Sequence, residues 1–156
     1  MDKKYELTDE SINYNDKKLY RIRALKNFAN VRKGDLGGYV ESENNLSQDR
    51  NCWVYDNAKV YDDAVIFGNA KVYNYAEVYG KAKICDYAQV YSNAEVYGNA
   101  KVYNNAEVYG HAEIYDNAQV YEDVVVYGHA EVCDNAEIYG NFEQRKDYWI
   151  FIELYI

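Results

Sequence analysis

A repeat of six residues runs without insertion or deletion from Asn51 to Gly140 and limits the possible folds more than any other feature. It contains 15 hexads, whose positions we number 1 to 6 as in NAKVYD, residues 57–62. Position 4 is Val or Ile in all 15 hexads, position 2 is Ala in 13, and position 5 is Tyr in 12. Positions 6 and 1 are mostly Gly, Asp or Asn. A turn-forming pair every six residues excludes a helix and predicts short strands separated by corners.

The chemistry of each position predicts the direction of its side chain. Val and Tyr favour extended backbone, so we expect positions 2 to 5 to form a strand. Because side chains alternate along a strand, Ala and Val at positions 2 and 4 should point inward, and positions 3 and 5 outward. Gly, Asp and Asn at the corner positions tolerate left-handed backbone angles. Three strands and three corners close a triangular coil of 18 residues, so the repeats predict about five regular coils.

The 18-residue period predicts three columns of stacked side chains on the outside of the coils. Two interpretations are open for them: cross-strand pairs that stiffen a thin core, or a flat aromatic face for a ligand or partner. The first column contains Tyr55, Tyr73, Tyr91, Tyr109 and Tyr127; the second contains Tyr61, Tyr79, Tyr97, Tyr115 and Cys133; the third contains Phe67, Cys85, Tyr103, Tyr121 and Tyr139. Cys85 and Cys133 should not meet, and Cys52, in an Ala position, should be inert core.

The two ends depart from the hexad, which divides the chain into residues 1–50, 51–140 and 141–156. In the first part, the segment SINYNDKKLYRI predicts a β-hairpin that turns at Asn15-Asp16. Leu36 and Val40, followed by Leu46, have the spacing of a degenerate first coil. Such a cap is needed because the first regular coil would otherwise expose unpaired backbone and core.

Residues 141–156 contain a strand that is apolar on both faces and therefore needs cover. The strand could fold over the last coil as a cap, or it could pair or pack with the same strand of another copy. We expect a homo-oligomer formed through this segment. Its predicted contact residues are Phe142, Tyr148, Trp149, Ile150, Phe151, Ile152, Leu154 and Ile156.

The spacing of Val and Ala, four residues apart, resembles the hexapeptide-repeat family over residues 51–140. This resemblance implies an all-β fold, a single-stranded left-handed parallel β-helix. The segments LYRIRAL (Leu19–Leu25), GDLGGYV (Gly34–Val40), and NLSQ with NCWVYD (Asn45–Asp56) are similar to a block in uncharacterised bacterial and phage hexapeptide-repeat proteins, which are often described only as transferases. With the repeats, the resemblance extends over about residues 15–140; it implies a fold and does not define an activity.

Charge and cysteine content limit the classes of partner. The net charge is −9, and residues 51–140 hold 14 acidic residues and five lysines. No Lys or Arg lies between Lys101 and Gly140, so this part should repel nucleic acid and membrane phosphates, and we expect it to bind neither directly. The chain has no recognisable signal peptide or apolar span and has three cysteines, an odd number, which predicts a cytoplasmic protein.

Acidic side chains form the predicted partner-binding surface. Position 3 beside the second column contains four glutamates, which would either keep the surface soluble or form a negative rod that imitates nucleic acid. Our leading hypothesis is a non-enzymatic binding or scaffold protein, in its most concrete form a phage or mobile-element inhibitor that blocks a basic protein surface. The predicted binding residues are Glu77, Glu95, Glu107, Glu113, Asp116, Glu122, Asp123, Glu131, Asp134 and Glu137.

Two alternatives remain open. The family resemblance implies that an acyltransferase-like enzyme would use a histidine general base at a subunit interface, and the candidates are His111 and His129. With Glu113 and Glu131 they could also bind a metal. Both occupy a corner position and no loop protrudes from the repeats, so we predict no catalytic residue, metal or cofactor. The second alternative is an oligomeric sponge for a small ligand such as a nucleotide, held in clefts lined by tyrosine.

Overall fold

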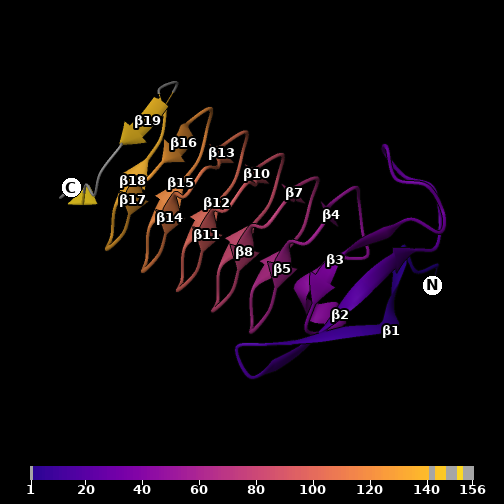
Figure 1. The fold of residues 1–156 in the computed structure, drawn as a ribbon. Helices are drawn as coiled ribbons and strands as arrows, with labels where there is room; N and C mark the ends of the chain where they lie inside the picture. The colour runs from indigo at the N-terminus through magenta and orange to yellow at the C-terminus, as the bar shows by residue number, and fades with distance from the viewer. Residues whose placement is uncertain (1, 141–142, 147–150, 153–156) are drawn as a thin grey trace.

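The computed structural model describes residues 2–140, 143–146 and 151–152. In Figure 1 these residues form a stack of three-sided coils that continues from a β-hairpin at the N-terminal end. The N-terminal elements are β1 (Tyr5–Tyr14), β2 (Lys17–Ala24), β3 (Leu36–Val40) and the 3₁₀ helix η1 (Glu43–Asn45). The described part of the chain contains no helix with the length and hydrophobicity of a membrane span.

The strands of the coils form three sheets, one on each side of the stack, which we call faces 1, 2 and 3. Face 1 contains β4 (Trp53–Val54), β7 (Lys71–Val72), β10 (Gln89–Val90), β13 (Glu107–Val108), β16 (Val125–Gly128) and β19 (Glu143–Lys146). Face 2 contains β5 (Lys59–Val60), β8 (Glu77–Val78), β11 (Glu95–Val96), β14 (Glu113–Ile114), β17 (Glu131–Val132) and β20 (Phe151–Ile152), and continues into β3, β2 and β1. Face 3 contains β6 (Val65–Ile66), β9 (Lys83–Ile84), β12 (Lys101–Val102), β15 (Gln119–Val120) and β18 (Glu137–Ile138).

The register of the sheets confirms the predicted coil length. Lys59 pairs with Glu77 and Glu77 with Glu95, in parallel, and the other two faces have the same spacing. The rings of Tyr73 and Tyr91 stack directly, with centroids 4.6 Å apart. All-β architecture and parallel stacked coils are therefore as predicted, and a left-handed winding is consistent with them.

The side chains at positions 2 and 4 form the core of the coils. From Cys52 to Ile138 every one of them is at most 1% exposed. The strands are shorter than expected, usually covering only positions 3 and 4. Positions 2 and 5 belong to the turns, because the N–H of Ala58 bonds to the carbonyl of Tyr55 in the preceding hexad, and the same bond recurs in later hexads. The N–H groups of positions 1, 3 and 5 bond mainly to the next coil, which ties the stack together.

Each corner turns at position 6. Every residue at this position has positive φ, from 56° at Asp56 to 106° at Gly140, whereas His111 and His129 at position 1 do not. Within each corner only position 6 is left-handed, so position 1, where both histidines lie, does not require that backbone angle. Asp and Asn have a second role at position 6: Oδ2 of Asp86, for example, accepts from the backbone N–H of Asn104 at 3.0 Å in the next coil. This side-chain bond satisfies an N–H that the corner leaves unpaired.

The N-terminal hairpin forms as predicted. β1 and β2 pair antiparallel, and Asn15 and Asp16 both have positive φ, as a two-residue hairpin turn requires. The strand β2 then pairs with β3, which pairs in parallel with β5. The hairpin therefore extends face 2 (Figure 1), and its residues Tyr5 and Ile22 are buried in the same core as Trp53 of the first coil, as expected of a cap.

The coil beneath the regular repeats departs from the predicted spacing. Val40 and Leu46 are fully buried; Val40 pairs with Val60, and Leu46 with Ile66. The two residues of each pair are further apart in the sequence than paired residues of the regular coils, so this first coil is longer. Leu36, expected in the same core, is 54% exposed. A β-bulge explains this error, because Gly37 and Gly38 lie opposite a single residue of β2 and reverse the side on which Leu36 points.

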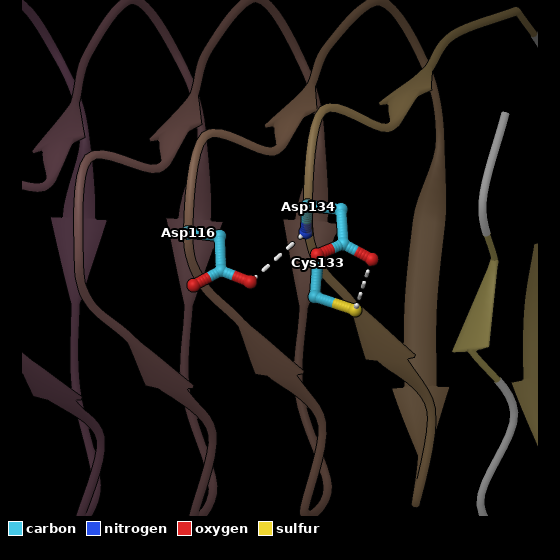
Figure 2. Close-up of side chains that lie close together, drawn as sticks. All are labelled: Asp116, Cys133 and Asp134. Atoms are coloured by element: carbon cyan, nitrogen blue, oxygen red, sulfur yellow. Dashed lines mark hydrogen bonds between the residues drawn. The ribbon is translucent and has the colours of Figure 1, made fainter. Parts of the chain in front are cut away.

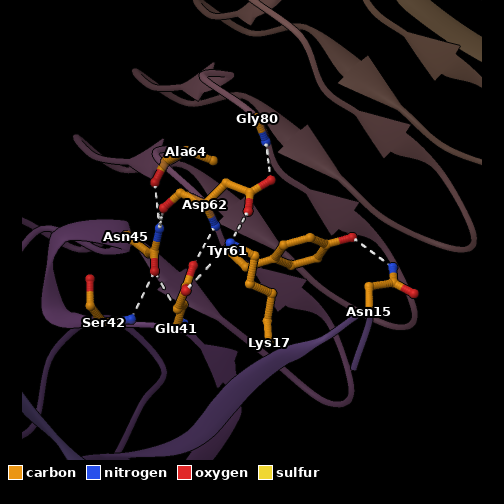
Figure 3. Close-up of polar contacts among 9 residues, drawn as sticks. All are labelled: Asn15, Lys17, Glu41, Ser42, Asn45, Tyr61, Asp62, Ala64 and Gly80. Carbon is orange, nitrogen blue, oxygen red and sulfur yellow. Dashed lines mark hydrogen bonds and ion pairs between the residues drawn. The ribbon is translucent and has the colours of Figure 1, made fainter. Parts of the chain in front are cut away.

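A polar network joins this first coil to the repeats (Figure 3). The side-chain amide of Asn45 donates to the carbonyls of Asp62 and Ala64 at 3.1 and 2.8 Å, and its Oδ1 accepts from the N–H of Ser42. Lys17 of the hairpin forms an ion pair with Asp62 at 3.0 Å. Asn45 is fully buried, so these bonds fix the first corner at a site where unpaired groups would be costly.

The C-terminal strands continue the stack. β19 pairs in parallel with β16, and β20 with β17, so Phe151 lies beside Glu131 in the sheet. The remaining predicted oligomer residues, Phe142, Tyr148, Trp149, Ile150, Leu154 and Ile156, lie outside the described residues. Only the backbone of Phe151 and Ile152 is described, and the oligomer stays a prediction.

Candidate binding surface

The three predicted aromatic columns are present on the outside of the stack. On face 2, Tyr61, Tyr79, Tyr97 and Tyr115 stack with centroids 4.9–5.1 Å apart and nearly parallel planes. Tyr73 to Tyr127 on face 1 and Tyr103 to Tyr139 on face 3 stack in the same way. Stacked rings are a favourable aromatic arrangement when they are offset, and they stabilise the parallel sheets from outside.

The tyrosine hydroxyls make a second set of contacts that the sequence reading missed. Tyr61, Tyr79 and Tyr97 each donate to Oε1 of a glutamate in the next coil, at 3.2, 3.2 and 3.4 Å; the acceptors are Glu77, Glu95 and Glu113. Each tyrosine thus joins its own coil to position 3 of the next coil. The signal was present in the sequence, because Tyr at position 5 is repeatedly followed by Glu or Gln at the position 3 that lies beside it in the next coil.

These contacts create a distinct electrostatic environment on face 2. Burial raises the pKa of Tyr79, and the neighbouring Glu95 raises it further, so this hydroxyl keeps its proton and remains a donor. Burial also raises the pKa of Glu95, as do the charges of Glu77 and Glu113. The bond from Tyr79 opposes this rise because it stabilises the carboxylate.

The column changes at its last glutamate. Burial and then Glu113 raise the pKa of Glu131 to about 7. Glu131 is 4% exposed, and its Oε2 has no hydrogen-bond partner among the described residues. The hydroxyl of Tyr115, which the pattern would direct to Glu131, interacts instead with the thiol of Cys133. Replacement of Tyr by Cys at this point therefore interrupts the hydrogen-bond pattern as well as the aromatic column.

The structure separates the predicted binding residues into groups. Glu77, Glu95, Glu113 and Glu131 form one column on face 2. Asp116 and Asp134 lie at the corner that follows face 2, while Glu107 is on face 1, Glu137 on face 3, and Glu122 and Asp123 at the corner after face 3. The predicted residues do not share one face, because consecutive hexads lie on different sides of the stack.

The corner after face 2 holds a group of potential metal ligands (Figure 2). Asp116, Cys133 and Asp134 place ligand atoms within 4.8 Å of one another, and no other such group occurs among the described residues. Oδ2 of Asp116 accepts from the N–H of Asp134 at 3.2 Å, as at other corners. Burial raises the pKa of the Cys133 thiol, which disfavours the thiolate that a metal needs. The arrangement is that of a hydrogen-bonded corner.

The two histidines meet as expected. The rings of His111 and His129 stack at 5.1 Å with an interplanar angle of 6°, and both are exposed. Their nitrogen lone pairs lie in parallel ring planes and do not converge on one point. Cys85 and Cys133 lie beside different faces, and all three cysteines are free, with Cys52 buried in the core.

Stacked coils of three six-residue repeats, with Ala and Val inside and Tyr outside, define a hexapeptide-repeat β-solenoid. No protein-family model matches the chain. A segment of 51 residues is 43% identical to the uncharacterized acetyltransferase YdcK of Escherichia coli (strain K12). The match covers 32% of this chain and 16% of YdcK, so the chain spans only a small part of that protein's length. Fold and match together support a hexapeptide-repeat architecture.

Proposed function

We propose that this chain is a non-enzymatic binding or scaffold solenoid that engages a basic protein surface through face 2. The observation that supports the proposal is the column of Glu77, Glu95 and Glu113, whose carboxylates are held by tyrosine hydroxyls. In its most concrete form the protein is an inhibitor from a mobile genetic element, and its target is a protein with a basic nucleic-acid groove.

Fixed carboxylates suit this role for an energetic reason. A flexible glutamate loses side-chain entropy when it binds, whereas Glu95 and Glu113 are already ordered by the bonds from Tyr79 and Tyr97. Each of these bonds is to Oε1, which leaves Oε2 to accept from arginine or lysine. The repeated negative charge would also increase the rate of encounter with a basic partner at low salt.

The test uses an isosteric change for which the chain offers a precedent. Gln89 on face 1 and Gln119 on face 3 occupy position 3 and accept from Tyr73 and Tyr103 at 3.0 and 3.1 Å. A Glu95→Gln/Glu113→Gln variant should therefore keep the stack and its hydrogen bonds while it loses two charges. Glu107→Gln on face 1 is the matched control for loss of charge elsewhere.

Immobilised wild-type protein is incubated with host lysate, and the captured proteins are identified by mass spectrometry across a salt gradient. We expect a basic protein that is released by salt, captured equally by the Glu107→Gln control, and lost with the double variant. Equal capture by the double variant, or capture of proteins without a basic surface, would contradict the proposal.

A second candidate function is an acyltransferase-like activity at a subunit interface, which the match to YdcK supports. His129 and His111 would be the bases in this case. If the protein is such an enzyme, we expect calorimetry to show that the wild-type protein binds acetyl-CoA and that His129→Ala abolishes this binding. Absence of binding by the wild-type protein in its assembled state would remove this candidate.

A further inference from the structure

The tyrosine column of face 1 is interrupted at its first member. Tyr55 meets Tyr73 edge to face, with an interplanar angle of 84° and centroids 6.2 Å apart, whereas the pairs from Tyr73 to Tyr127 are stacked. The hydroxyl of Tyr55 donates to Oδ1 of Asn30 at 3.1 Å, in the loop after β2. This bond holds the Tyr55 ring out of the column. A hollow of about 240 Å³ results, lined by Asn30, Tyr55, Asp56, Lys71, Tyr73 and Gln89.

The polar groups that line the hollow are mostly unused donors. Lys71 is half-buried and has no hydrogen-bond or ion-pair partner among the described residues. Gln89 uses Oε1 to accept from Tyr73, which leaves its amide N–H groups free to donate. Asn30 likewise uses its oxygen for Tyr55 and keeps its N–H groups. Asp56 adds a carboxylate to the lining, and its Oδ2 accepts two hydrogen bonds from Asn74, at 3.0 and 3.2 Å.

A comparison with a second hollow shows why this pattern is informative. The hollow beside the first corner is lined by Lys17, Glu41 and Asp62, among others. There the ammonium of Lys17 is paired with Asp62 at 3.0 Å and with Glu41 at 3.8 Å (Figure 3). The ammonium of Lys17 is therefore ion-paired within the protein. On face 1, by contrast, a cation and two amides remain without acceptors among the described residues, in a chain whose net charge is −9.

We propose that the hollow on face 1 binds a small planar aromatic anion, such as a monocyclic aromatic carboxylate. The ligand ring would pack against the rings of Tyr55 and Tyr73, which favour offset-stacked or edge-to-face contacts with another aromatic ring. Its carboxylate would accept a charge-assisted bond from Lys71 and bonds from the amides of Gln89 and Asn30. A volume of about 240 Å³ selects a single ring over a dinucleotide or a lipid.

The ligand class is tested with three probes that separate ring from charge. Protein NMR is used to titrate benzoate, cyclohexanecarboxylate and benzamide into the full-length protein. We expect benzoate to bind more tightly than both other probes and to shift signals of Tyr55, Tyr73 and Lys71. Equal binding of cyclohexanecarboxylate, shifts confined to another face, or no saturable binding of benzoate up to about 10 mM would overturn the proposal.

Two variants test the residues. Lys71→Met removes the cation, and Gln89→Glu places a carboxylate where the donor was while keeping an acceptor for Tyr73, as Glu95 does for Tyr79. Each should weaken benzoate binding by about fivefold or more, the effect of roughly 1 kcal/mol. Lys101→Met is the control, because Lys101 holds the same position on face 3, where Tyr103 and Tyr121 stack at 4.8 Å. Unchanged affinity in both test variants, or an equal loss in the control, would overturn the proposal.

Discussion

The hydroxyl of Tyr79 donates a hydrogen bond at 3.2 Å to Oε1 of Glu95, which lies in the next coil of the stack. The ring of the same tyrosine stacks on Tyr97 at 4.9 Å. One side chain therefore makes both an aromatic and a polar contact with the next coil. Because Glu95 is also a proposed partner contact, stiffening of the stack and binding at its surface are two roles of the same residues.

Loss of the hydroxyl should weaken the stack. Tyr79→Phe keeps the ring contacts but leaves Glu95 without its donor, so we expect the free energy of unfolding to fall by about 1 kcal/mol. Tyr109→Phe is the matched control, because Tyr109 stacks between Tyr91 and Tyr127 while Val125, at the equivalent position of the next coil, offers no acceptor. Denaturant unfolding of both variants measures the difference. Equal losses would mean that the hydroxyl bond is not what stabilises face 2.

Removal of one charge from the glutamate column should stabilise the protein. In Glu113→Gln the amide oxygen can still accept from Tyr97, and the repulsion by Glu95 disappears. We expect a gain of about 0.2–1 kcal/mol at neutral pH and low salt, decreasing as salt screens the charges. Glu107→Gln should show no such gain, because Glu107 lies between Gln89 and Val125. A destabilised Glu113→Gln in thermal unfolding would contradict this account.

Stability should decrease as pH rises towards 8. The pKa of Glu131 is raised from its ordinary value of 4.5 to about 7, so the folded state keeps a proton that the unfolded state releases. This contribution is fully present below about pH 4.5 and is lost as pH rises through 7. Melting temperatures measured between pH 5 and 8 check the trend, and Glu131→Gln should reduce the slope. An unchanged slope in that variant would assign the effect to other groups.

The corner carboxylates should contribute individually to stability. Oδ2 of Asp86 accepts from both the N–H and the side-chain amide of Asn104, at 3.0 Å each, and Asp86 has a φ of 57°. Asp86→Ala loses both bonds and places alanine at a left-handed backbone angle. We therefore expect the free energy of unfolding to fall by about 1–2 kcal/mol. Asp86→Gly should cost less because glycine adopts this angle freely, and Asp86→Asn should be nearly neutral. A different order in chemical denaturation would show that the corner bonds do not set the preference for Asp.

Most of the repeat architecture was predictable from the hexad alone. The small Ala and branched Val fill an interior that is the same in every hexad, and the turn-forming residues fix where each strand ends. These are local preferences, reinforced at every repeat, so the alignment of Tyr73 over Tyr91 followed directly. The bond from Tyr79 to Glu95 was missed because it depends on how far a ring leans towards the next coil.

The N-terminal part shows the limit of pattern reading. Leu36 and Val40 have the spacing of core residues, yet the bulge at Gly37 and Gly38 turns Leu36 to solvent. These glycines lie against the first coil: a Cβ would come within 2.5 Å of the Val54 carbonyl at Gly37 and 2.6 Å of the Ala58 carbonyl at Gly38. The bulge is thus decided by contacts with residues far along the chain.

The sequence by itself determined a three-sided stack with an aliphatic interior and tyrosine columns. The strand and corner of each hexad depend only on the side-chain sizes and backbone preferences of its own six residues. Only the tertiary structure decided that the bulge turns Leu36 to solvent and where the Tyr55 ring leaves its column. Those features arise where a non-repeating segment, such as the loop that carries Asn30, meets the regular coils. Contacts of that kind are unique in the chain, so no periodicity encodes them.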